Sequence, residues 1–136
     1  MTILSIDLGK MMGISIHNNG FEHKEEYKFS GYNDFYNKVN DLILLWKPSL
    51  ILIPYPTRFY RVILSQAKLM GIVCMLADKN QIQVIEVQDA TCKKAVLGSG
   101  KAKKEEIMEF FDEESEHVAD SKMFIMWYIK NLEKKS

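Results

Sequence analysis

Hydrophobic residues alternate with polar ones in some segments of this chain and recur at helical spacing in others. Short apolar or alternating segments predict β-strands at residues 2–8, 12–17, 21–29, 50–53 and 82–87. Apolar residues at helical spacing predict helices at residues 30–46, 59–79, 89–97, 102–112 and 118–134. Three strands followed by alternating helices and strands predict an α/β fold with a mixed sheet and helices on its faces.

Two of these strands have a predictable place in the sheet. Residues 50–53 are continuously apolar, which is typical of a central parallel strand that is buried on both faces. Residues 21–29 are polar enough for an edge strand. Asn18-Asn19-Gly20 is a turn sequence and predicts a hairpin between the second and third strands.

The composition is that of a soluble globular protein. At 136 residues, 47% hydrophobic and 26% charged, we expect a single domain over residues 1–136 with one sizeable core. The longest apolar run is shorter than the roughly 18 residues of a membrane span, so no membrane association is expected. Cys74 and Cys92 lack CxxC spacing, and we expect reduced, buried thiols in a cytoplasmic protein.

The net charge of zero conceals a segregation of charge. Residues 90–104 contain no acid but five lysines, namely Lys93, Lys94, Lys101, Lys103 and Lys104. This basic block surrounds a Gly-Ser-Gly turn and is suited to a phosphate backbone, although lysines on a solvated helix and loop give the same pattern. The charges of residues 105–116 are almost all acidic, and we expect most of them on a solvated helix surface.

Three residues form a candidate metal site. Asp7 ends an apolar first strand, where a carboxylate is costly to bury unless something pairs with it. A divalent cation is a good candidate for that partner. His117 and Asp120 stand one helical turn apart and therefore share a face of their helix.

Four segments of the chain resemble, in order, the motifs of one known family. They are Ile6-Asp7-Leu8-Gly9 with the nearby Gly13, residues 64–71, residues 87–104, and His117-Val118-Ala119-Asp120-Ser121. They are similar to that family's "IDPG…TG", "LGQARG", "VKxxVxGxGxAxK" and "D/H-x-x-D-A" motifs. Over nearly its whole length the chain resembles a RuvC-type Holliday-junction resolvase of the ribonuclease H-like superfamily. The resemblance implies a ribonuclease H-like fold, with a central mixed five-stranded sheet flanked by helices.

The resemblance also implies a chemistry. Such enzymes hydrolyse a phosphodiester bond with two divalent cations, usually Mg²⁺, for which Mn²⁺ can substitute. By this resemblance Asp7 would bridge the metals, and His117 and Asp120 would complete the metal site. Lys93 and Lys104 match the two motif lysines, which are expected to contact the DNA backbone or the developing phosphate charge. The remaining lysines of the basic block, Lys94, Lys101 and Lys103, would add backbone contacts.

One position departs from the family pattern. The family carries a glutamate at the end of its fourth strand, where this chain has Pro54, which has no ligand atom in its side chain. Three explanations remain open. Another carboxylate replaces it, with Glu86 as the tentative candidate; the enzyme is slow or uses one metal; or the protein binds branched DNA without cutting it.

The segment after Pro54 corresponds to a family loop that probes the junction centre. There Phe59 or Tyr60 would stack on an unpaired base and Arg58 would hold a phosphate. Alternatively, the two aromatic residues begin the long helix and pack on the sheet. The family is dimeric, since a four-way junction has two-fold symmetry, and the helix starting near Phe59 would supply much of that interface.

The leading hypothesis is a metal-dependent endonuclease that cleaves Holliday junctions or other branched DNA in recombination and repair. An alternative is a catalytically weak or inactive protein that binds branched DNA and retains the fold. A further alternative is a YqgF-like nuclease acting on RNA. The short length and divergent motifs suit a bacteriophage or mobile-element member, in the cytoplasm of a bacterium or an infected host cell.

Overall fold

The computed structural model describes residues 1–56 and 60–135. Its strands are β1 (Ile3–Asp7), β2 (Met11–His17), β3 (Phe21–Lys28), β4 (Leu50–Pro54) and β5 (Gln83–Val87). Its helices are α1 (Tyr32–Trp46), α2 (Tyr60–Lys79), α3 (Asp89–Leu97), α4 (Lys104–Phe111) and α5 (Glu116–Lys135).

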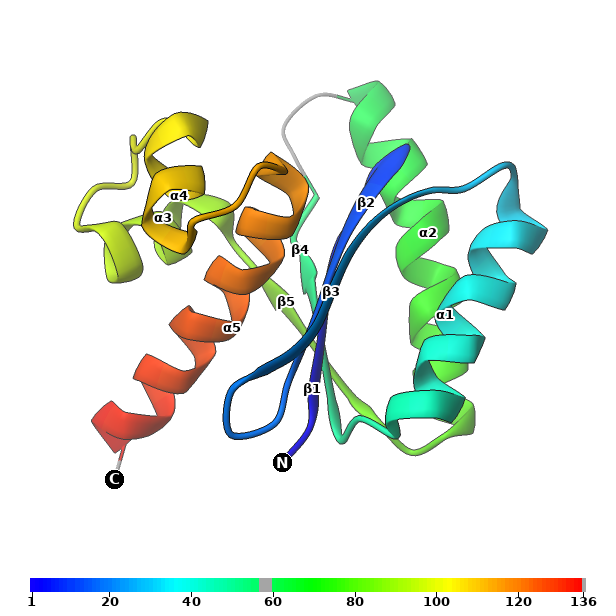
Figure 1. The fold of residues 1–136 in the computed structure, drawn as a ribbon. Coiled ribbons are helices and arrows are strands. Elements are labelled where there is room, and N and C mark those ends of the chain that lie inside the picture. Colours follow the sequence, from blue (N-terminus) through cyan, green and yellow to red (C-terminus); the bar gives the residue numbers. More distant parts are fainter. Residues whose placement is uncertain (57–59, 136) are drawn as a thin grey trace.

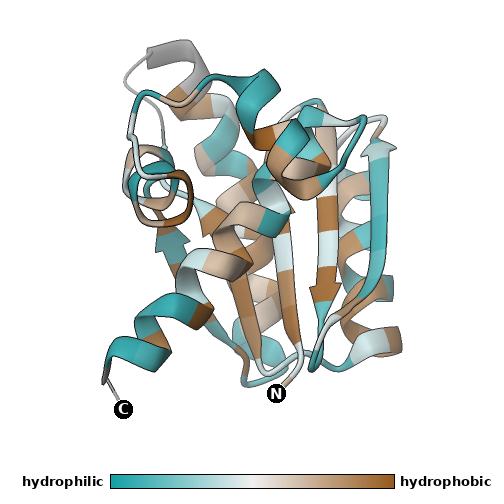
Figure 2. Cartoon of the chain, turned by 60° about the vertical axis from the view of Figure 1, so that its left-hand side comes forward, coloured by the Kyte–Doolittle hydropathy of each residue, from teal (hydrophilic) through white to brown (hydrophobic). Residues whose placement is uncertain are grey.

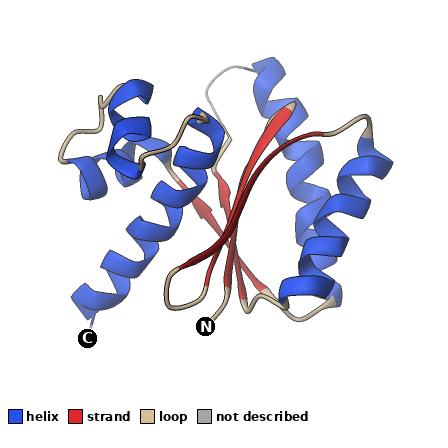
Figure 3. Ribbon diagram, in the orientation of Figure 1, coloured by secondary structure: helices blue, strands red, loops and turns tan. Residues whose placement is uncertain are grey.

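The strands form one mixed sheet in the order β3-β2-β1-β4-β5. β1 pairs antiparallel with β2 and parallel with β4, β2 pairs antiparallel with β3, and β4 pairs parallel with β5. The sheet runs between two groups of helices (Figure 3). This is the mixed, helix-covered sheet that the order of elements predicts.

Each face of the sheet has its own hydrophobic core. Leu4 and Ile6 of β1 pack with α1 and α2, whereas Ile3 of the same strand packs with α3, α4 and α5. Side chains alternate between the two faces along a strand, so β1 contributes to both cores. Figure 1 shows α1 and α2 on one side of the sheet and α3, α4 and α5 on the other.

The predicted places of two strands are confirmed. All five residues of β4 are buried, because helices cover both faces of the sheet at this central strand. β3 lies at the edge with partly exposed residues along its length. Asn19 and Gly20 both have positive φ in the turn that joins β2 to β3, as expected of a hairpin turn. Figure 2 shows hydrophobic central strands and a hydrophilic strand at one edge of the sheet.

Most element bounds differ from the sequence-based expectation by one or two residues, and one cysteine differs in burial. Helix α5 begins at Glu116, two residues before the predicted start, because a side chain of the preceding loop caps it. Cys92 is buried as predicted, but Cys74 is exposed, because it lies on a solvent-facing position of α2. Among the described residues no helix is long and apolar enough to cross a membrane.

Candidate functional site

Asp7 stands at the end of β1, on the face of the sheet that α5 covers. Ile3, Ser5 and Asp7 share that face because side chains alternate along the strand. Ile3 and Ser5 are buried, and the side chain of Asp7 is 17% exposed. The first strand therefore delivers a largely buried carboxylate beneath the start of α5.

Helix α5 brings His117 to this carboxylate. His117 Nδ1 donates to Asp7 Oδ2 across 3.2 Å, although the two residues are 110 positions apart in the sequence. Asp120 follows one turn later on the same helix, and the negative charge of Asp7 raises its pKa. The structure thus brings together the three residues that the sequence proposes as metal ligands.

Gly13 allows α5 to approach the sheet this closely. It lies opposite Asp7 in the β1–β2 pair. A Cβ atom at Gly13 would lie 1.9 Å from the carbonyl oxygen of His117, far inside ordinary contact. Further along, Ser15 Oγ and Ser121 Oγ lie 2.6 Å apart in a buried hydrogen bond between β2 and α5. The helix that carries His117 and Asp120 is therefore seated directly on β2.

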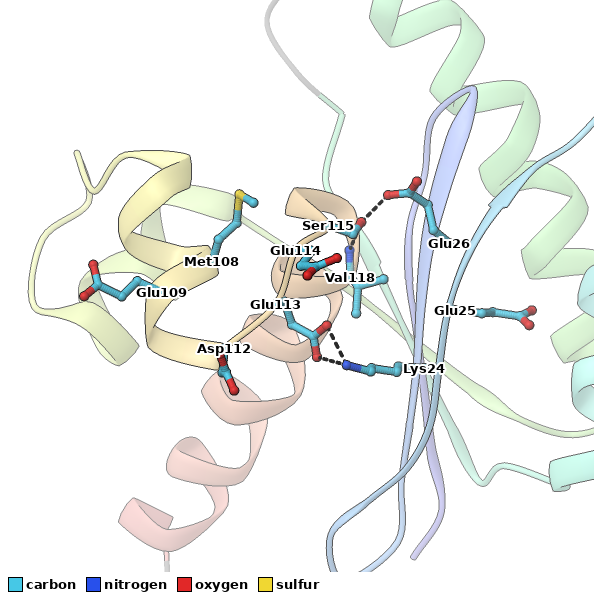
Figure 4. A pocket seen from close by; sticks show the side chains of 10 residues that line it. All are labelled: Lys24, Glu25, Glu26, Met108, Glu109, Asp112, Glu113, Glu114, Ser115 and Val118. Atoms are coloured by element: carbon cyan, nitrogen blue, oxygen red, sulfur yellow. Dashed lines mark hydrogen bonds and ion pairs between the residues drawn. The ribbon is translucent and has the colours of Figure 1, made fainter.

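The start of α5 is fixed by a capping interaction that the sequence analysis missed. Ser115 Oγ accepts a hydrogen bond from the backbone N–H of Val118 (3.2 Å), and the Ser115 hydroxyl donates to Glu26 of β3. A serine before a helix is a common N-cap, so this signal was present in the sequence. Figure 4 shows Glu26 and Val118 reaching Ser115 from opposite sides.

A second anchor lies beside this cap. Glu113 accepts hydrogen bonds from Lys24 of β3 (2.8 Å) and Lys122 of α5 (2.5 Å), and its side chain is only 6% exposed. Burial opposes ionisation of Glu113, but the two lysines outweigh it and hold the pKa of this carboxyl below its usual value. The expectation of a solvated acidic run is wrong at Glu113, because this residue is a buried link between β3 and α5.

The carboxylates of the site repel one another. Burial, followed by the charges of Asp7 and Asp89, raises the pKa of Asp120 to about 8. Burial also raises the pKa of Asp7, although its hydrogen bond from His117 acts in the opposite direction. That same hydrogen bond raises the pKa of His117. The site therefore disfavours the ionised form of these carboxyls, which a bound cation would stabilise.

The donor atoms fit a divalent cation. Carboxylate oxygens are the ligands that Mg²⁺ and Mn²⁺ prefer, and an imidazole suits a transition metal such as Mn²⁺. In residues 1–56 and 60–135, no three or more His, Cys, Asp or Glu side chains already stand in an arrangement that would hold a metal ion. The chemistry of the donor set thus fits a metal, and binding requires the side chains to rearrange.

The basic residues predicted to contact DNA lie on α3, the start of α4 and the loop between them. Lys104 Nζ lies 3.7 Å from Glu116 Oε2, and the other oxygen of Glu116 lies 3.5 Å from His117 Nε2, so Lys104 stands beside the site. Lys93 pairs with Asp89 across 2.6 Å. The other lysines of the block are exposed, namely Lys94, Lys101 and Lys103.

Glu86, the tentative replacement ligand, does not join the site. Its Cα partner in β4 is Ile53, whose side chain packs in the α1–α2 core. Paired residues of neighbouring strands point to the same face, so Glu86 points away from Asp7. Consistent with this, the charge of Glu86 raises the pKa of Cys74 on α2.

The remaining predicted contacts cannot be placed. Arg58 and Phe59 lie outside the described residues, as does the side chain of Tyr60, whose backbone begins α2. Pro54 is buried at the end of β4, level with Val87 of β5. Its ring leaves this part of the site without a ligand atom.

Comparisons with known proteins find one similar sequence and several similar folds. No family model matches the sequence. Over 101 residues, 73% of this chain, it is 29% identical to the crossover junction endodeoxyribonuclease RuvC of Prochlorococcus marinus (strain MIT 9312), and it covers 62% of that protein's length. The structure of Thermus thermophilus RuvC matches over 96% of both chains, with a TM-score of 0.75 and 19% identity. The chain is thus similar in sequence to one RuvC protein and similar in fold to solved RuvC structures.

Two further solved structures extend this likeness. T. thermophilus RuvC in complex with a Holliday junction substrate matches with a TM-score of 0.75, 16% identity and 96% coverage of both chains. The fowlpox virus resolvase in complex with Holliday junction DNA matches with a TM-score of 0.65 and 14% identity, over 97% of this chain and 99% of that one. At these identities the likeness establishes the fold, which is ribonuclease H-like and of the RuvC type.

Proposed function

We propose that this protein is a metal-dependent endonuclease that cleaves four-way DNA junctions. The observation that carries the proposal is the position of Asp7. It lies at the end of β1 in a RuvC-type fold, with its Oδ2 atom 3.2 Å from His117 Nδ1, and Asp120 follows His117 by one helical turn. A basic block stands beside these residues, where a DNA backbone would pass.

Each group would have a distinct role. Asp7 and Asp120 would hold the cation, Mg²⁺ or Mn²⁺, and His117 would orient Asp7 or join it as a ligand. When bound, the cation would polarise the scissile phosphodiester and supply an activated water. Lys104, at the mouth of the site, would hold the phosphate, and Lys93, Lys94, Lys101 and Lys103 would hold the flanking backbone.

Cleavage of a labelled synthetic four-way junction tests this proposal. We expect paired, symmetric nicks in Mg²⁺ or Mn²⁺, no cutting of a matched linear duplex, and no products in chelator. Asp7→Asn should abolish cleavage while junction binding persists, because the variant keeps the basic block but loses a ligand charge. Cutting by that variant would overturn the proposed site, and cutting of a four-way RNA in preference to DNA would overturn the substrate.

Pro54 favours a second candidate, a branched-DNA-binding protein without catalysis. The family's glutamate is missing at this position, and the side chain of Pro54 offers no replacement. In that case the protein would bind the junction tightly in chelator and yield no products at any Mg²⁺ or Mn²⁺ concentration.

The proposal includes a homodimer in the cytoplasm of a bacterium or an infected host cell. Paired cuts in a two-fold symmetric junction need two sites. Exposed apolar side chains on α2, such as Leu64 (45% exposed) and Met75 (52% exposed), support this helix as the contact between subunits. Light scattering with and without junction DNA would give the subunit number, and a monomer in both states would overturn this part.

A further inference from the structure

Asp89 lies at the edge of the sheet where the family's carboxylate is missing. It is the first residue of α3, two positions after Val87 ends β5. β5 runs parallel to β4, and β4 runs parallel to β1. The ends of these three strands therefore meet at one edge, so Asp7, Pro54 and Asp89 lie on the same side of the molecule.

The packing of α3 brings Asp89, whose side chain is 49% exposed, near Asp120. Cys92 is one helical turn after Asp89, on the same face of α3, and is fully buried. It packs in the core that contains Ala119 and Met123 of α5. Asp120 directly follows Ala119, so both aspartates lie near the contact between α3 and α5.

The electrostatics agree with this placement. The charge of Asp89 raises the pKa of both Asp7 and Asp120. Burial raises the pKa of the Cys92 thiol to about 12, and the charges of Asp89 and Asp120 add to this rise. Both carboxylates therefore flank the same thiol.

One lysine now balances these charges. Lys93 Nζ pairs with Asp89 Oδ2 across 2.6 Å, and the charge of the same lysine favours ionised Asp120. A positive group is thus already held near two of the carboxylates. A divalent cation in this place would free Lys93 to contact a DNA phosphate.

We infer that Asp89 supplies the metal-binding carboxylate that Pro54 removes, and that it exchanges Lys93 for the cation when the metal binds. This inference rests on the proposed function for the identity of the site. Glu116 is the alternative candidate for this metal-binding carboxylate, because its charge also raises the pKa of Asp7. It lines a pocket with Met11 of β2 and Glu26 of β3, however, and pairs with Lys104.

Metal binding without DNA tests the inference separately from cleavage. Free Mn²⁺ is followed by electron paramagnetic resonance during titration of the wild type, Asp89→Asn and Asp112→Asn. Asp112 is a matched control, since it is an exposed aspartate in the same layer of helices, and its charge acts on Lys24 of β3 rather than on the proposed ligands. Changes in the outer shell of a metal site cost roughly 10–100-fold in affinity, so Asp89→Asn should weaken Mn²⁺ binding by at least about tenfold. Asp112→Asn should bind as the wild type does.

A rescue variant strengthens the test. Pro54→Glu in the Asp89→Asn background returns a carboxylate to the family position and should restore Mn²⁺ affinity. Circular dichroism melts show whether each variant is folded, and the comparison of Asp89→Asn with Asp112→Asn stands even if the double variant does not fold.

Each outcome decides one of the two proposals. Wild-type Mn²⁺ affinity in Asp89→Asn, or a loss in Glu116→Gln alone, would overturn the role of Asp89, whatever the protein cuts. Loss of Mn²⁺ binding in Asp89→Asn would support it, even if the wild type proved unable to cut junctions. In that last case the proposed function would fail while the metal site remained.

Discussion

Gly13→Ala is the substitution for which the structure makes the sharpest prediction. The added Cβ would lie 1.9 Å from His117 O and 2.0 Å from His117 C, whereas ordinary contact begins at 3.4 Å. The start of α5 must therefore retreat from β2 by about 1.5 Å, because backbone atoms cannot turn aside as a flexible side chain does.

The cost of this retreat follows from the packing. Overpacking a core costs about 1–3 kcal/mol, and a clash with helix backbone belongs at the upper end of that range. In a domain of this size, about 3 kcal/mol lowers the melting temperature by roughly 10 °C. Junction cleavage should fall further than stability, since the displaced residues carry the proposed ligands His117 and Asp120.

Thermal melts followed by circular dichroism, with cleavage measured well below the melting temperature, check this prediction. Gly71→Ala is the control, because a Cβ at this position in α2 meets nothing within 4 Å. It should stabilise the protein by up to about 1 kcal/mol through helix propensity. If Gly13→Ala melts and cuts like the wild type, α5 does not rest on β2 as described.

Three further substitutions give separate outcomes. Lys104→Ala should weaken junction binding and reduce its salt dependence by about one unit of slope, measured by titration at several salt concentrations. Glu113→Gln should lower the free energy of unfolding by about 1–3 kcal/mol near pH 7. Because the pKa of Glu113 is lowered in the folded state, its contribution is present above the unfolded pKa and is lost as pH falls through the folded pKa. Urea unfolding should therefore show the two proteins converging in acid, and a constant difference would contradict this. Ser115→Ala should cost about 1 kcal/mol by loss of the helix cap, and an unchanged melt would show that the cap is dispensable.

The elements of the fold could be predicted because each hydrophobic pattern is local. The unbroken apolar residues of β4 and the polar edge strand β3 have the places that their patterns indicate. Pro54 is included at the end of β4, and the next residue, Tyr55, still donates its N–H to Val87 O across 2.7 Å. A proline therefore ends the strand without separating it from β5.

The candidate site was predictable only where a motif carried it. Asp7, His117 and Asp120 were proposed from their spacing and from the resemblance. In the structure Asp7 contacts His117, and its charge raises the pKa of Asp120. The Glu86 side chain lies on the face of the sheet that α2 covers. The sequence alone does not show which helices cover which face. The proximity of Asp89 to Asp120 depends on how α3 packs against α5, and the link from Glu113 to Lys24 joins elements that are far apart in sequence.

The contact between Asp7 and His117 has a consequence for biosynthesis. One partner belongs to the first strand and the other to the last helix, separated by 110 positions. A nascent chain that has reached the end of α4 contains every strand and the basic block, but it lacks the helix that faces Asp7. Such an intermediate would present the lysines proposed to bind DNA without the ligands proposed on α5. The proposed nuclease activity would thus arise only once α5 has left the ribosome and packed against β2 at Gly13.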